Sequence, residues 1–366
     1  MSIVRLTESD IHRMIANTVG ILLESADEKS GVIMAEKENE IQEIIDYICQ
    51  WWAAAKGDVS KMVDRGNIGI AGDDNVGTVD LYRFSVPNHI TKKLDVALNH
   101  EFEVFIKDLH FDMNKYGQYI GHAERSTNGT SYGGEDYTRF IKPQMKFSES
   151  KIDVTVPAIN GQLQLQGLYV TLYHELNHNV STLRINQKGF EGRSVGDMNR
   201  RNNYDRHVNM MQALNPHPFV HFGRRIQYGE NGAEVLHMMI FMIYGLWETT
   251  ERNARAESLY GDLLYMKSTP ETFEEDFKKT DVYYCIEQFK DFIRTGQAFD
   301  DNSSMWKEIA NLTGHKNANY ADPASVKRRF LKRSQELVNI LYQKAMKVAK
   351  FYFQKKGFTQ AKAPGM

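Results

Sequence analysis

Tyr173-His174-Glu175-Leu176-Asn177-His178 contains the pattern H-E-x-x-H, and the rest of the chain can be interpreted around it. On a helix, residues four positions apart lie about 40° apart around the axis, so both imidazoles can reach one cation from the same side. Two neutral imidazoles are good zinc ligands, and a glutamate beside the first histidine is placed to take a proton from water. The pattern therefore predicts a zinc site with His174 and His178 as ligands and Glu175 as general base.

The residues around this pattern predict a helix with one apolar face. Leucine and valine recur at spacings of four and three, at Leu168, Leu172, Leu176, Val180 and Leu183. His174 and His178 lie roughly opposite this stripe, so we expect the helix to pack its leucines on the core and turn its histidines towards a cleft. The alternative is a chance match on a surface helix, which occurs in on the order of a few per cent of chains with this many histidines.

A catalytic zinc needs a third protein ligand and an open position for water. The best candidates lie in residues 247–257, directly after an apolar run at 235–247 that is too short to span a bilayer and is typical of a buried helix. Glu251 is the predicted third ligand. Glu248, one turn earlier on nearly the same face, is the alternative ligand. Glu257 is turned away and is expected to be solvated or paired with an arginine.

This combination resembles the gluzincin type of zinc metallopeptidase, in which H-E-x-x-H on one helix is completed by a glutamate of a downstream helix in an E-x-x-A setting. The matching residues are His174, Glu175, His178, Glu251 and Ala254. The resemblance implies that Glu175 is the general base and that Glu251 binds the metal. Some relatives carry aspartate directly after the alanine. This chain has Arg255 there, so it lacks the acid that supports the first histidine in those relatives.

The chain as a whole predicts an α+β fold, mostly helical with a small sheet, as a zincin-like domain. Residues 36–56 predict a helix, the glycine-rich residues 66–87 a β-hairpin, and residues 101–107 a strand. Residues 151–157 alternate as a strand that ends at Pro157. The family resemblance implies that this strand is the sheet edge to which an extended peptide substrate pairs, and an ordinary sheet strand is the alternative.

A long polar connection, residues 185–232, separates the two predicted ligand helices and is expected to shape the cleft. A peptidase also needs a hydrogen-bond donor for the developing oxyanion. Four residues are chemically able to serve, and the sequence does not choose among them: Tyr204, His207, His221 and Tyr228.

We predict three parts along the chain: an N-terminal amphipathic helix (residues 1–30), the zincin-like domain (31–320), and a C-terminal basic amphipathic helix with a tail (321–366). Residues 4–15 resemble a leader segment that recurs at the start of proteins of Bacteroidetes and of the phages that infect them. That resemblance implies a phage-encoded or virion-associated protein. A first helix docked on the core is the alternative.

The C-terminal helix is predicted from its ends and its periodicity. Asp322 is the expected cap, Pro323 the first turn and Gly357 the stop. The expected apolar seam consists of Val326, Phe330, Leu337, Leu341, Val348 and Tyr352. The other faces carry Lys327, Arg328, Arg329, Lys332, Arg333, Lys344, Lys347, Lys350, Lys355 and Lys356. These cations predict either a solvated face or a docking surface for an acidic partner, nucleic acid or membrane surface.

The composition is that of an ordinary soluble globular protein: 366 residues, 42% hydrophobic and 25% charged, with a formal net charge of −2. This balance does not indicate nucleic-acid binding by the whole chain. Cys49 and Cys285 are expected to be buried free thiols. The chain opens with no secretory signal and has no apolar stretch of transmembrane length, so a cytoplasmic location is expected, or a virion-associated one for a phage protein.

The sequence thus predicts a zinc-dependent metallopeptidase that hydrolyses a peptide or isopeptide bond of a peptide or protein substrate. Two other interpretations stay open. One is a structural or interaction protein, such as a phage particle component, whose metal site is vestigial or only structural. The other is a zinc hydrolase that acts on something other than protein.

Overall fold

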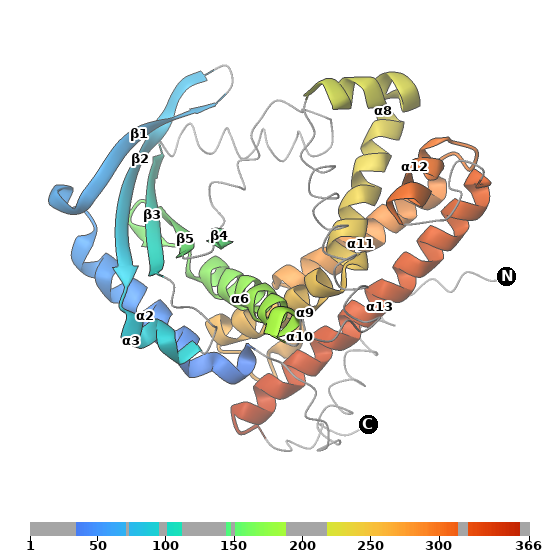
Figure 1. The fold of residues 1–366 in the computed structure, drawn as a ribbon. Helices are drawn as coiled ribbons and strands as arrows, with labels where there is room; N and C mark the ends of the chain where they lie inside the picture. The colour runs from blue at the N-terminus through green and yellow to red at the C-terminus, as the bar shows by residue number, and fades with distance from the viewer. Residues whose placement is uncertain are drawn as a thin grey trace. The chain divides into compact units, whose positions relative to one another are not determined.

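The structure is a computed structural model that describes residues 34–70, 73–94, 101–111, 144–147, 151–187, 218–313 and 321–358. The helix predicted in residues 1–30 lies outside this part of the chain. The fold is α+β, as predicted: mostly helical, with one small mixed sheet (Figure 1). Contacts divide the chain into a sheet unit, Ile33–Asn179, and a helical unit, Val180–Met366 together with Met1–Val32. Each unit is described by itself below.

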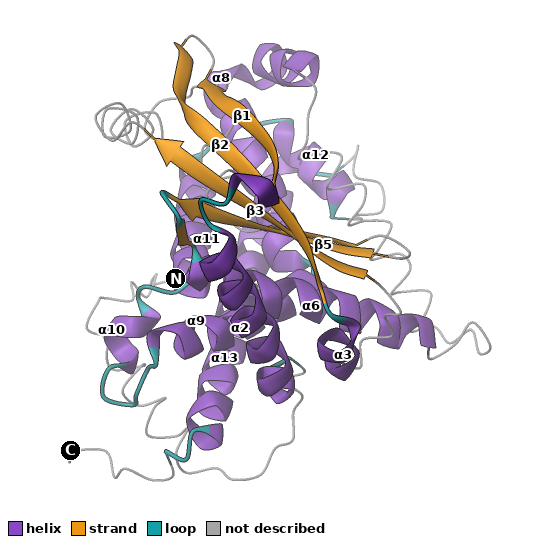
Figure 2. Ribbon diagram, turned by 90° about the vertical axis from the view of Figure 1, so that its left-hand side faces the viewer, coloured by secondary structure: helices purple, strands orange, loops and turns teal. Residues whose placement is uncertain are grey.

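The described part of the sheet unit contains six strands. Strands are drawn in orange in Figure 2. They are β1 (Met62–Ile70), β2 (Asp73–Val86), β3 (Glu101–Phe111), β4 (Gln144–Phe147), β5 (Lys151–Ile159) and β6 (Gln162–Leu163). The order is β1-β2-β3-β5-β4, with β6 paired to β5, and only β3 and β5 run parallel. The predicted hairpin (β1 and β2) and the strand at 101–107 (β3) are therefore confirmed.

Strand β5 confirms the predicted strand at 151–157 but not its place or its end. It lies between β3 and β4, so the prediction that it is a sheet edge is wrong, and β4 is the outer strand on that side. Nor does β5 end at Pro157. The carbonyl of Pro157 accepts a hydrogen bond from the Gln164 N–H. On that side of β5, the pairing with β4 ends at Thr155 and the pairing with β6 begins at Ala158. A strand residue directs its N–H and C=O to the same side, so proline's missing donor falls in this gap and removes no ladder bond.

Helix α2 (Glu38–Ala55) follows the 3-10 turn η1 (Ala35–Lys37) and packs on the sheet, which confirms the predicted helix at 36–56. Its buried side consists of Ile41, Ile44, Ile45, Ile48, Trp52 and Ala55. The ring of Trp51 stacks on Phe84 at 3.9 Å between centroids, and Trp52 meets Tyr82 edge-on at 5.1 Å. The short elements η2 (Val59–Lys61), α3 (Asn88–Thr91) and η3 (Lys92–Leu94) complete this part of the unit.

A tight hairpin between β5 and β6 sets the start of the histidine helix. Asn160 and Gly161 both have positive φ, 48° and 79°, as a two-residue type I′ turn requires. The Asp108 carboxylate accepts the Gly161 N–H at 2.8 Å, which ties the turn to β3. Helix α6 (Leu165–Gln187) begins directly after β6. Within the described side chains of α6, the predicted apolar stripe is buried at Leu168, Leu172 and Leu176.

The helical unit contains a set of packed helices in its described part. They are α8 (Pro218–Met242), the π-helical turn η4 (Ile243–Trp247), α9 (Thr249–Met266), α10 (Phe273–Phe277), α11 (Asp281–Ala298), α12 (Met305–Leu312) and α13 (Pro323–Lys355). Helix α8 is kinked at Gly229, where φ is 74°. Helix α13 packs along α9, α11 and α12. None of the described helices is long and apolar enough to cross a membrane.

Helix α13 has the predicted ends and the predicted seam. The Asp322 side chain accepts the Ser325 N–H at 2.9 Å, and Gly357 has φ 77° just past the last turn. All six residues of the predicted seam are buried. One cation differs from the prediction: Lys327 is buried, and its ammonium donates to the carbonyls of Gln297 and Phe299 and to Asp301. Lys327 therefore closes the end of α11 and is not part of an exposed basic face.

Candidate metal centre

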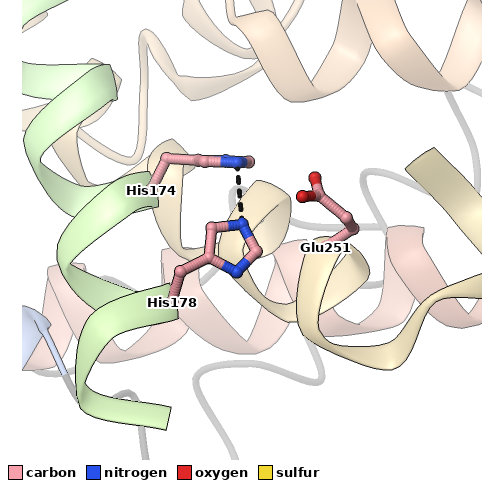
Figure 3. Close-up of side chains that lie close together, drawn as sticks. All are labelled: His174, His178 and Glu251. Carbon is pink, nitrogen blue, oxygen red and sulfur yellow. Dashed lines mark hydrogen bonds between the residues drawn. The ribbon is translucent and has the colours of Figure 1, made fainter. Parts of the chain in front are cut away.

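His174 and His178 meet at their ε nitrogens. On α6 the two rings stand one turn apart, with Nε2 atoms separated by 3.2 Å and ring planes inclined at 72° (Figure 3). Two nitrogens bound to one tetrahedral zinc at about 2.0–2.1 Å lie about 3.3–3.4 Å apart. The observed separation is close to that value, so the pair needs little movement to share one ion.

Glu175 lies beside the same nitrogen atoms. Its Oε1 is 3.9 Å from Nε2 of His174, and its side chain is 33% exposed, against 17% for that of His174. The neighbouring Tyr173 and Leu176 are fully buried. One face of α6 is thus packed in the core, while its polar face presents two imidazoles and a carboxylate that water can reach.

Glu251 owes its position to a break in the helix. The π-helical turn η4 ends at Trp247, and Glu248 has extended backbone (φ −69°, ψ 125°). The Glu248 carbonyl then accepts from the Arg252 N–H and starts α9, which places Glu251 in the first turn of that helix. A carboxylate is favoured there by the partial positive charge of the helix N-terminus. The Glu251 side chain is enclosed, with only 4% of its surface exposed.

Tyr244 and Arg255 contact the carboxylate of Glu251. The Tyr244 hydroxyl, from η4, donates to Oε1 at 2.9 Å, and the Arg255 guanidinium lies 3.8 Å from Oε2. Burial lowers the pKa of Arg255, but the neighbouring Cys285, Glu251 and Asp281 outweigh it and raise the pKa above its ordinary value. Arg255 therefore carries a full positive charge beside the carboxylate.

The structure brings His174, His178 and Glu251 together. One ligand atom from each lies within 4.8 Å of the others, and Figure 3 shows the Glu251 carboxylate facing the two imidazoles. Two imidazoles and a carboxylate are a donor set that zinc accepts. Among the described residues, Glu248 is not in this group. Glu257 is buried, so the expectation that it is solvated is wrong; it lies close enough to Lys344 to affect the pKa of that residue.

The structure describes the side chain of only one of the four candidates for the oxyanion donor. Tyr204 and His207 lie outside the described residues, and only the backbone of His221 is described, within α8. The Tyr228 hydroxyl donates to Glu308 at 3.1 Å. Tyr228 is thus engaged with α12, and the structure gives no geometry that links it to the histidines.

Comparison of the chain with protein-family models, with curated proteins and with solved structures found no match. The candidate centre is therefore argued from its own geometry. Sequence reasoning missed Tyr244 and the π-helical turn that carries it. The available signal was weak: Tyr244 stands seven positions before Glu251, a spacing that places two residues on one face of a continuous helix, but the helix between them is interrupted.

Proposed function

We propose that this protein is a zinc-dependent peptidase in which His174, His178 and Glu251 hold the metal and Glu175 is the general base. The observation that carries the proposal is the polar face of α6, where the two Nε2 atoms are 3.2 Å apart and the Glu175 carboxylate lies 3.9 Å from one of them. When bound, zinc would lower the pKa of a water molecule and polarise the scissile carbonyl.

Glu175 supplies the proton transfers of this proposal. Its carboxylate accepts a proton from the attacking water as the new C–O bond forms, and returns that proton to the leaving amine as the C–N bond breaks. The partial exposure of Glu175 suits this role, because water must reach the carboxylate and the products must leave. His174 and His178, fixed one turn apart on a helix with a buried face, need no rearrangement between turnovers.

The alternative of a purely structural metal site is less well supported. Structural zinc is held by four protein ligands, whereas a catalytic zinc keeps one position open. Within the described part of the chain the group contains three ligands, and two of them lie on a partly exposed helix face. The choice of peptides as substrates rests on the gluzincin resemblance of the H-E-x-x-H and E-x-x-A segments.

The test compares Glu175→Gln with wild-type protein on a mixture of fluorogenic peptides, with zinc measured in both. We expect hydrolysis to fall by about 10²–10⁴-fold while bound zinc is unchanged, because glutamine keeps the shape of the side chain but cannot accept the proton. Glu43→Gln is the matched control, since Glu43 is a carboxylate of the same unit paired with Lys93 at the surface. Undiminished hydrolysis by Glu175→Gln would contradict the mechanism.

A further inference from the structure

The third ligand is held by a second layer of residues that lies entirely within the helical unit. Glu251 is in the first turn of α9, and a side chain on that turn would otherwise be free to choose among several rotamers. Its Oε1 is fixed by the Tyr244 hydroxyl at 2.9 Å. Tyr244 belongs to a π-helical turn, and such turns inside helices occur frequently at functional sites.

Arg255 reaches the other oxygen of Glu251 because the π-helical turn gives it room. Its guanidinium donates to Sγ of Cys285 on α11 at 3.1 Å and lies 3.8 Å from Oε2 of Glu251. A Cβ on Gly245 would lie 3.3 Å from Nε and Nη2 of Arg255 and 3.0 Å from Cζ of Phe289. Both contacts are tighter than most real Cβ contacts, so a side chain at position 245 would displace the guanidinium or the Phe289 ring by a few tenths of an ångström.

The surrounding residues hold the π-helical turn itself in place. The Trp247 indole N–H donates to Ser334 on α13 at 2.9 Å, and Arg252 donates to the carbonyl of Leu246 at 2.7 Å. The last carbonyls of η4 are therefore satisfied without continuing the helix. Tyr244 and Gly245 are thus part of a rigid turn, which is what a support for a metal ligand requires.

We infer that Tyr244 and Arg255 are positioning residues that orient the Glu251 carboxylate for the metal, and that the missing side chain of Gly245 leaves the space in which the Arg255 guanidinium lies. The inference rests on the proposed zinc site and goes beyond the three ligands. It also assigns a purpose to Arg255, whose guanidinium lies 3.8 Å from Oε2 of Glu251. Its position supports the third ligand.

The test measures zinc affinity by competition with a chromophoric chelator. We expect Tyr244→Phe and Gly245→Ala each to weaken zinc binding by about 10–100-fold, as is typical when a partner of a metal ligand is removed. Tyr352→Phe is the matched control, because it also removes a buried tyrosine hydroxyl of the same unit, one that donates to the Ser268 carbonyl at 3.2 Å. Its zinc affinity should stay within about twofold of wild type, well below the range expected for the site variants.

A second readout separates positioning from a merely structural role. Cobalt(II) bound in place of zinc has visible absorption bands that report the geometry of its ligands. We expect Tyr244→Phe and Arg255→Met to change these bands, Arg255→Lys to restore them in part, and Tyr352→Phe to leave them as in wild type. A general loss of stability would lower the unfolding temperature of all four without changing the bands.

The outcomes distinguish the inference from the proposed function. Wild-type protein that binds zinc tightly, with equal affinity in Tyr244→Phe and Gly245→Ala and equal cobalt spectra in Tyr244→Phe and Arg255→Met, would overturn the inference and leave the zinc site standing. Folded wild-type protein that binds neither zinc nor cobalt would overturn the proposed function, and the positioning role with it.

Discussion

Each unit of the molecule contains a buried carboxylate next to an arginine, and the two pairs differ in a way that separates structure from function. In the sheet unit, Arg65 meets Asp80 through two short hydrogen bonds of 2.6 and 2.9 Å, and the arginine is 59% exposed. In the helical unit, Arg255 lies 3.8 Å from Glu251, and the arginine is only 12% exposed. The Arg65–Asp80 pair is therefore close and partly exposed to water, whereas the Arg255–Glu251 pair is more widely separated and buried.

The two carboxylates also differ in the residues that surround them. Both oxygens of Asp80 are occupied by the guanidinium fork, and His110 lies 3.3 Å from one of them, so this carboxylate is fully used in holding strands together. The Tyr244 hydroxyl donates to Glu251, and the Arg255 guanidinium lies at a longer ionic distance from it. Among the described residues, Glu251 shares a group of possible metal ligands with His174 and His178, and Asp80 belongs to no such group. Glu251 is thus the better candidate for metal binding.

The largest expected effect concerns metal binding. Glu251→Gln should weaken zinc binding by about 1,000-fold or more, because it replaces the anionic ligand with a neutral amide in a buried site. Asp80→Asn should leave zinc affinity unchanged. Isothermal titration of the two variants beside wild type checks this contrast. Equal zinc affinity in all three proteins would remove the distinction between the two carboxylates.

The next effect concerns stability. Arg255→Met should lower the free energy of unfolding by about 3–5 kcal/mol, because it leaves the enclosed Glu251 charge without its cation. Arg65→Met should cost less, since its guanidinium is mostly in water and solvent screens the pair. Urea unfolding of both variants measures the two losses. A larger loss for Arg65→Met would reverse our interpretation of which pair is enclosed.

The smallest effect is a pH dependence of the sheet pair. Hydrogen bonds from Arg65 hold the pKa of Asp80 below its ordinary value of 3.8. The pair therefore contributes stability that is complete above pH 3.8 and is lost as the pH falls through the lower folded value. Unfolding measured from about pH 5 to pH 2 should show a weaker acid dependence in Asp80→Asn than in wild type. An identical acid dependence would mean that Asp80 is not the group that titrates.

Periodicity within one helix made much of the molecule predictable. The buried stripe of α6, the seam of α13 and the approach of His174 to His178 all follow from the 3.6-residue repeat, and the cap of α13 follows from Asp322 before Pro323. Glu251 was predicted as the third ligand from its place after the apolar run, with Glu248 as the alternative, and the family resemblance also implied Glu251.

The features that were missed depend on partners far away in the sequence. The apolar run at 235–247 has the pattern of one continuous helix, and nothing in it signals the π-helical turn η4. Arg255 is placed by Cys285, thirty residues further on, and by the absence of a side chain at Gly245. The interior place of β5 is set by β4, a strand of four residues with too short a pattern to recognise.

Elemental analysis of purified wild-type protein beside the double variant His174→Ala, His178→Ala decides whether the chain binds zinc through these two histidines. We expect about one zinc per chain in wild type and none in the variant, with both proteins folded, because the two imidazoles supply most of the ligands of a three-ligand site. No zinc in folded wild-type protein, or equal zinc in both proteins, would contradict this expectation.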